Sequence, residues 1–71
     1  MNRAEIITWV KGLIDGYKQT IEMWVQEGSF EKDEYSWQEM LDMYTGVEVE
    51  TLDEIESLTD GELKKIVDEY I

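Results

Sequence analysis

The chain has 71 residues and a formal net charge of −12 at pH 7, and it contains no histidine, cysteine or proline. Without histidine and cysteine it lacks the commonest general base and the imidazole and thiolate metal ligands, so we expect no enzymatic activity, no metal site and no cofactor. The negative charge argues against direct binding to nucleic acid or to an anionic membrane, since both are polyanions, and it favours a basic partner.

The length predicts one domain, residues 1–71, with a small hydrophobic core. A hydrophobic content of 42% with three tryptophans favours a folded chain over a disordered one. No apolar run reaches the ~18 residues that read as a membrane span, and the first residues lack the apolar core of a signal peptide and carry Glu5. Together with the absence of cysteine, these features favour a cytoplasmic location.

Helix starts recur along the chain in one form, a capping residue followed three positions later by glutamate. The four pairs are Asn2/Glu5, Ser36/Glu39, Thr51/Glu54 and Thr59/Glu62. Gly28 and Gly46 each follow an apolar segment and predict helix ends. These signals predict an all-α fold, a small bundle of three to four helices with a long N-terminal helix.

The first predicted helix covers about residues 3–27 and carries an apolar stripe at helical spacing. The stripe consists of Ile6, Ile7, Val10, Leu13, Ile14, Tyr17, Ile21, Trp24 and Val25. Gly12 and Gly16 lie one turn apart beside this stripe. We expect them to admit close approach of another helix or to mark a bend; the alternative is a groove for a partner's side chain.

The second predicted helix covers about residues 36–45. Residues 47–51 then alternate between apolar and acidic side chains, which predicts extended chain. We expect a connector whose valines touch the core, the alternative being an edge that pairs with a partner or with a second copy. Two further helices are predicted at about residues 52–57 and 60–70.

The net charge is concentrated in the middle of the chain. Residues 27–62 contain thirteen carboxylates and a single base, Lys32, whereas the segments on either side each sum to zero. In those two outer segments each lysine has an acid four positions later, an arrangement that predicts ion pairs along a helix. The predicted pairs are Lys11–Asp15, Lys18–Glu22, Lys64–Asp68 and Lys65–Glu69.

Some of the central carboxylates are accounted for by helix starts, because acids in the first turn favour the helix dipole. Eight others have no structural role that the sequence indicates: Glu31, Asp33, Glu34, Asp42, Glu48, Glu50, Asp53 and Glu56. They do not fit a calcium loop of the EF-hand kind, since ending such a loop at Glu39 puts Phe30 at a ligand position. Their surplus charge either keeps the protein soluble or forms a binding surface for a basic partner.

Carboxylates one helical turn apart, or on alternate residues of an extended chain, are spaced so that a channel lined by lysine and arginine can contact them in succession. We therefore predict that the eight acids, with Tyr35 or Trp9 as an aromatic anchor, imitate a nucleic-acid backbone. The predicted partner is the basic surface of a nucleic-acid-binding protein.

A chain with this length and charge, no cysteine, and an acidic segment interspersed with Phe30, Tyr35 and Trp37 resembles a class of small inhibitors. These are the acidic proteins by which bacteriophages and mobile elements block host nucleic-acid-binding machinery: anti-CRISPR, anti-restriction and DNA-mimic proteins. The resemblance implies a CRISPR or restriction nuclease as the partner. The alternative is a helical protein–protein interaction module without mimicry, or a homodimer joined through the Gly12/Gly16 flank.

Overall fold

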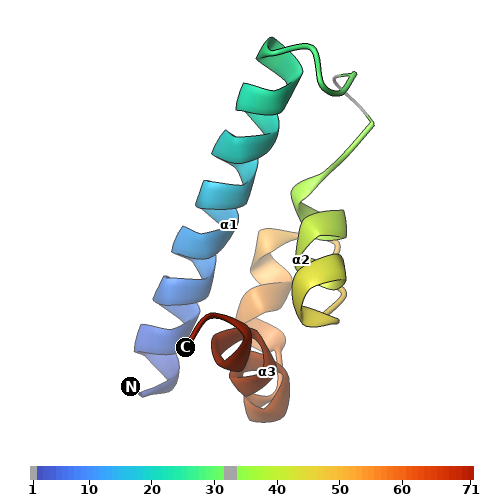
Figure 1. The fold of residues 1–71 in the computed structure, drawn as a ribbon. Coiled ribbons are helices and arrows are strands. Elements are labelled where there is room, and N and C mark those ends of the chain that lie inside the picture. The colour runs from blue at the N-terminus through green and yellow to red at the C-terminus, as the bar shows by residue number, and fades with distance from the viewer. Residues whose placement is uncertain (1, 32–33) are drawn as a thin grey trace.

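The computed structural model describes residues 2–31 and 34–71, and shows three α-helices and one 3-10 helix (Figure 1). They are α1 (Arg3–Gln26), α2 (Trp37–Thr45), η1 (Leu52–Ser57) and α3 (Asp60–Tyr70). The all-α prediction is confirmed, and each helix begins and ends within one residue of the predicted position. No strand occurs in the described part of the chain.

α1 is bounded by local signals at both of its ends. The Asn2 side chain accepts a hydrogen bond from the Glu5 amide at 2.9 Å, and the Asn2 amide donates to the Glu5 carboxylate at 3.4 Å. At the other end Gly28 adopts a positive φ of 82°, a conformation that glycine reaches without steric penalty. The amides of Gly28 and Ser29 then donate to the carbonyls of Val25 and Trp24, so the last turn is satisfied within the chain.

The other elements pack on one side of α1 (Figure 1). The molecule is elongated and measures 39 × 19 × 18 Å. α1 contacts α2, η1 and α3, and α2 also contacts α3. The buried core is shared among all four helices and the connections: Val10, Ile14, Tyr17, Met40, Leu41, Val47, Val49, Ile55, Leu58, Leu63 and Ile66. The C-terminal turns of α1 extend beyond α2, and the chain returns from them through the α1–α2 connection (Figure 1).

Gly12 and Gly16 do not admit another helix of this chain. Both are exposed, and a Cβ atom added at either position would meet nothing within 4 Å. The prediction of close approach is wrong because the other elements pack on the stripe that contains Val10, Ile14 and Tyr17, and leave the glycine flank to solvent. α1 continues through both glycines as an α-helix.

The segment after α2 is the predicted extended connector. Val47 and Val49 are buried whereas Glu48 and Glu50 are exposed, as the alternating sequence indicates. Thr45 directs the chain into this segment, because its hydroxyl donates to the Leu41 carbonyl at 2.6 Å and accepts from the Val47 amide at 3.3 Å. The alternation therefore places the valines in the core and the carboxylates on the surface.

The predicted caps of the later helices are only partly confirmed. Ser36 accepts a hydrogen bond from the Glu39 amide at 3.3 Å, and Thr59 and Glu62 form the full reciprocal box. Thr51 makes no side-chain cap, so that prediction is wrong. η1 is a 3-10 helix, and the Glu54 amide, which the predicted cap would direct to the Thr51 hydroxyl, donates instead to the Thr51 carbonyl at 3.2 Å.

None of the helices in the described ranges is both long enough and apolar enough to cross a membrane.

Candidate partner-binding site

An open cleft of about 510 Å³ lies between α2 and the extended segment that follows it. The cleft is lined by Gln38, Glu39, Asp42, Glu48, Val49, Glu50 and Glu54, so five of its seven residues carry a carboxylate. We call this feature the acidic cleft. It brings together three of the acids predicted for partner binding, namely Asp42, Glu48 and Glu50.

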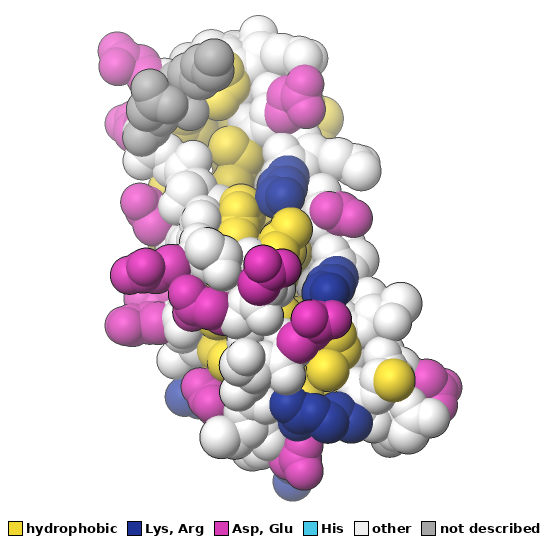
Figure 2. Space-filling view, turned by 180° about the vertical axis from the view of Figure 1, so that it is seen from behind, with side chains coloured by type: hydrophobic (Ala, Val, Ile, Leu, Met, Phe, Trp, Pro, Cys, Tyr) yellow, Lys and Arg dark blue, Asp and Glu magenta, His cyan; other side chains and the backbone are white. Residues whose placement is uncertain are grey.

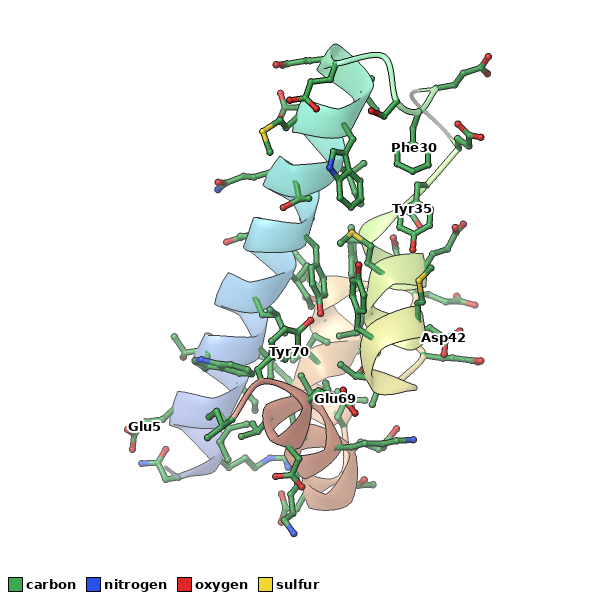
Figure 3. The ribbon with its side chains drawn as sticks, in the orientation of Figure 1. Glu5, Phe30, Tyr35, Asp42, Glu69 and Tyr70 are labelled. Carbon is green, nitrogen blue, oxygen red and sulfur yellow. The ribbon has the colours of Figure 1, made fainter. Side chains whose placement is uncertain are left out.

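Two local structures position these carboxylates. Glu39 and Asp42 lie one turn apart on the exposed side of α2, and Figure 3 shows Asp42 pointing away from α1. The extended segment turns Glu48 and Glu50 outward because the valines on either side of Glu48 face the core. The Gln38 side chain donates to the Glu50 carbonyl at 3.0 Å and thereby holds the segment against α2.

Glu39 and Glu54 line the cleft although neither is among the predicted partner-binding acids, because the sequence explains both as helix-cap residues. Glu39 makes no reciprocal bond to the cap of α2, so its carboxylate is available to the cleft. Glu54 accepts a hydrogen bond from the Glu50 amide at 3.2 Å, which fixes one oxygen within the cleft wall. The spacing of Glu39 to Asp42 was the signal that pointed to a shared face.

The other predicted acids lie outside the acidic cleft. Glu31 and Glu34 are exposed in the α1–α2 connection, where the Glu31 amide donates to the Glu34 carboxylate at 3.0 Å. Asp33 lies outside the described residues. Asp53 is exposed on η1 but does not line the cleft.

Glu56, in contrast, has a structural partner. Its carboxylate pairs with the ammonium of Lys11 at 3.2 Å because η1 packs beside α1. This contact replaces the predicted Lys11–Asp15 pair. Glu56 therefore contributes less free charge to the surface than the cleft residues do.

Tyr35 is not a freely exposed anchor. Its ring is partly buried and stacks on Phe30, with ring centroids 5.6 Å apart and an interplanar angle of 22°. Its hydroxyl donates to the Met43 sulfur at 3.2 Å. Figure 3 shows Phe30 and Tyr35 together in the connection between α1 and α2. Trp9, the other predicted anchor, is partly buried and packs edge-on against Tyr70 at 6.0 Å.

The basic side chains that the structure describes are engaged elsewhere. Arg3 pairs with Asp60 at 2.5 Å, and the Lys18 ammonium lies 5.8 Å from the centre of the Trp37 ring. Lys65 lies against Gly46 at the C-terminus of α2, where its charge complements the helix dipole. Of the four predicted lysine–acid pairs, only Lys64–Asp68 forms, at 4.0 Å.

The carboxylates of the acidic cleft have no ion-pair partner among the described residues. Within residues 2–31 and 34–71, no lysine or arginine comes within 4.0 Å of its carboxylates. Figure 2 shows several acidic side chains along the edge of the molecule on the α2 side, and further acidic side chains interspersed with basic ones over the rest of the visible face.

Two tyrosines, Tyr17 and Tyr35, have a raised pKa. Burial raises the pKa of Tyr17 well above its ordinary value of 10.0, and a hydrogen bond to the Tyr70 hydroxyl adds to the effect. Partial burial also raises the pKa of Tyr35, with smaller contributions from Tyr44 and Glu39. Both phenols are therefore neutral near pH 7.

In the described part of the chain, no three acidic side chains are placed to hold a metal ion together. Comparisons of the whole chain with protein-family models, with curated proteins and with solved structures gave no match.

Proposed function

We propose that the protein binds the basic surface of a nucleic-acid-binding protein, for example a CRISPR or restriction nuclease, and inhibits or regulates it by occupying the site of the nucleic acid. The observation that carries this proposal is the acidic cleft, where five carboxylates line one hollow and no described basic side chain forms an ion pair with them. Such an arrangement opposes folding through like-charge repulsion, and a cationic partner would remove that repulsion.

The spacing of the carboxylates supports the same proposal. Glu48 and Glu50 alternate along an extended segment, which sets their Cα atoms roughly 6.6 Å apart. Glu39 and Asp42 lie one helical turn apart, with Cβ atoms about 5–6 Å from each other. A partner that lines its nucleic-acid channel with lysine and arginine can contact these two rows in succession.

The test compares two variants of equal net charge in a competition assay. In the cleft variant Asp42, Glu48 and Glu50 are all changed to Lys; in the control variant the exposed acids Asp15, Glu22 and Glu27 on and beside α1 are changed to Lys. Each protein is titrated into complexes of fluorescent DNA with a panel of CRISPR and restriction nucleases, and DNA release is followed by anisotropy.

The wild-type protein and the control variant are expected to displace DNA from a susceptible nuclease at low salt, and the cleft variant is not. Displacement should weaken as salt rises, because the attraction is screened. Equal displacement by the cleft and control variants, with both retaining the helical circular dichroism signal, would contradict the proposal.

The alternative is a homodimer without mimicry. It is favoured by an exposed apolar group at the end of α3, where Ile71 is 82% exposed and Tyr70 packs beside Trp9. Sedimentation equilibrium separates the two proposals, since a homodimer requires a mass that increases with protein concentration.

A further inference from the structure

The exposed side of α2 carries a large apolar side chain beside the acidic cleft. Met43 is 63% exposed, although α2 buries the neighbouring Met40 and Leu41. It follows Asp42 directly and lies one turn after Glu39, so apolar and acidic side chains share one helix face. An apolar side chain left in water forgoes the stabilisation that its burial would give.

Met43 also contacts a cluster of aromatic side chains through Tyr35. The Tyr35 hydroxyl donates to its sulfur, Tyr35 stacks on Phe30, and Phe30 packs against Trp24 with ring centroids 5.5 Å apart. These aromatic rings connect the C-terminal end of α1 with the exposed side of α2, which we call its outer face. Met43 is therefore the exposed edge of an apolar ledge formed by Tyr35 and Met43, with the acidic cleft alongside it.

We propose that the outer face of α2 receives a basic amphipathic helix of the partner. The apolar stripe of that helix would lie on the ledge of Met43 and Tyr35, and its lysine or arginine side chains would enter the acidic cleft. This inference rests on the proposed function and narrows it, because it specifies the chemistry of the segment that is bound.

Charge complementarity and the placing of the ledge select this occupant. A nucleic-acid channel whose wall is basic throughout would satisfy the carboxylates but would leave Met43 exposed, so we expect the wall to include a helix that also carries apolar side chains. A basic amphipathic helix presents an apolar stripe next to a cationic one. These two stripes complement the exposed face of α2, where an apolar side chain lies next to acidic side chains. α2 has nine residues and spans roughly 13 Å, enough to contact about two turns of such a helix. Methionine suits this role because its flexible side chain adapts to different apolar surfaces.

The experiment uses three synthetic peptides with equal numbers of lysines and the full-length protein. The first is a helix-forming peptide with leucine and lysine at amphipathic spacing, the second has the same composition in scrambled order, and the third replaces leucine by glutamine. Binding of each labelled peptide is measured by fluorescence anisotropy at 50 and 150 mM NaCl. The wild-type protein is expected to bind the amphipathic peptide about tenfold more tightly than the other two.

Variants then separate the ledge from the cleft. Met43→Gln keeps the length of the side chain but removes its apolar character, and should weaken binding of the amphipathic peptide about tenfold without changing the other two. Met43→Leu should restore the preference. Met23→Gln is the matched control, because Met23 is a methionine on α1 that is 51% exposed. Circular dichroism verifies that each variant folds.

The results distinguish this inference from the proposed function. If the wild-type protein binds all three peptides equally, or if Met43→Gln leaves the preference intact, the inference is overturned while binding through the acidic cleft stands. If the peptides bind as strongly when Asp42, Glu48 and Glu50 are changed to Lys, the acidic cleft is not the binding site and the proposed function fails as well.

Discussion

At the scale of single residues, the glycines of α1 stand in positions where a side chain would fit. Gly12 and Gly16 have helical backbone and open space around the position of a Cβ atom. Alanine restricts the unfolded chain more than glycine does, and it is the better helix former by about 1 kcal/mol. We therefore expect Gly12→Ala and Gly16→Ala each to raise the free energy of unfolding by about that amount, measured by urea denaturation.

Gly46 is the matched control for these two substitutions. It adopts a positive φ of 76°, and a Cβ atom there would come within 2.9 Å of the Lys65 ammonium. Gly46→Ala should therefore lower the stability, because a left-handed backbone costs alanine about 1–2 kcal/mol. A loss of stability at Gly12 or Gly16 would contradict the open positions seen here, and would point instead to a contact with a second subunit.

At the scale of elements, two threonines precede helices but act differently. The Thr59 side chain accepts a hydrogen bond from the Glu62 amide at 3.2 Å, whereas Thr51 makes no side-chain cap to η1. We expect Thr59→Ala to destabilise the protein by about 1 kcal/mol and Thr51→Ala to have almost no effect. Thermal unfolding followed by circular dichroism measures both. Equal losses for the two variants would show that the hydroxyl of Thr51 caps η1 in solution.

The helices could be predicted from the sequence because their boundaries are encoded locally. Asn2 with Glu5 starts α1, Gly28 ends it, and Thr59 with Glu62 starts α3, all through contacts between residues near in the chain. The type of η1 could not be predicted, because apolar spacing over six residues suits an α-helix and a 3-10 helix equally.

The candidate site was only partly predictable, because it depends on contacts that local sequence signals do not encode. Glu39 and Glu54 stand at positions that the sequence explains as helix caps, so only Asp42, Glu48 and Glu50 could be predicted for the site, although all five line the acidic cleft. The cleft itself depends on the extended segment being held against α2, where the Gln38 side chain donates to the Glu50 carbonyl. The pairing of Lys11 with Glu56 likewise joins elements that are far apart in the sequence. Such contacts follow from packing and leave no local pattern.

At the scale of the whole molecule, the net charge of −12 is spread over a body only 39 Å long. The distance over which charges interact falls from about 30 Å at 0.01 M salt to about 10 Å at 0.1 M. Added NaCl should therefore reduce repulsion among the carboxylates and raise the midpoint of urea unfolding. A midpoint that rises with NaCl is expected when the acidic side chains of the surface repel one another and are not paired with basic side chains.

The two triple-lysine variants locate that repulsion. Each reversal removes one negative charge and adds one positive charge, so three reversals change the net charge from −12 to −6 in both variants. If the repulsion is concentrated in the acidic cleft, the variant with Asp42, Glu48 and Glu50 changed to Lys should gain more stability at low salt, and respond less to NaCl, than the variant with Asp15, Glu22 and Glu27 changed. Equal responses would show that the repulsion belongs to the molecule as a whole. A wild-type midpoint that falls with salt would mean that the ion pairs of Arg3 and Lys11 outweigh the unpaired acids, and would remove the stability argument for a cationic partner at the cleft.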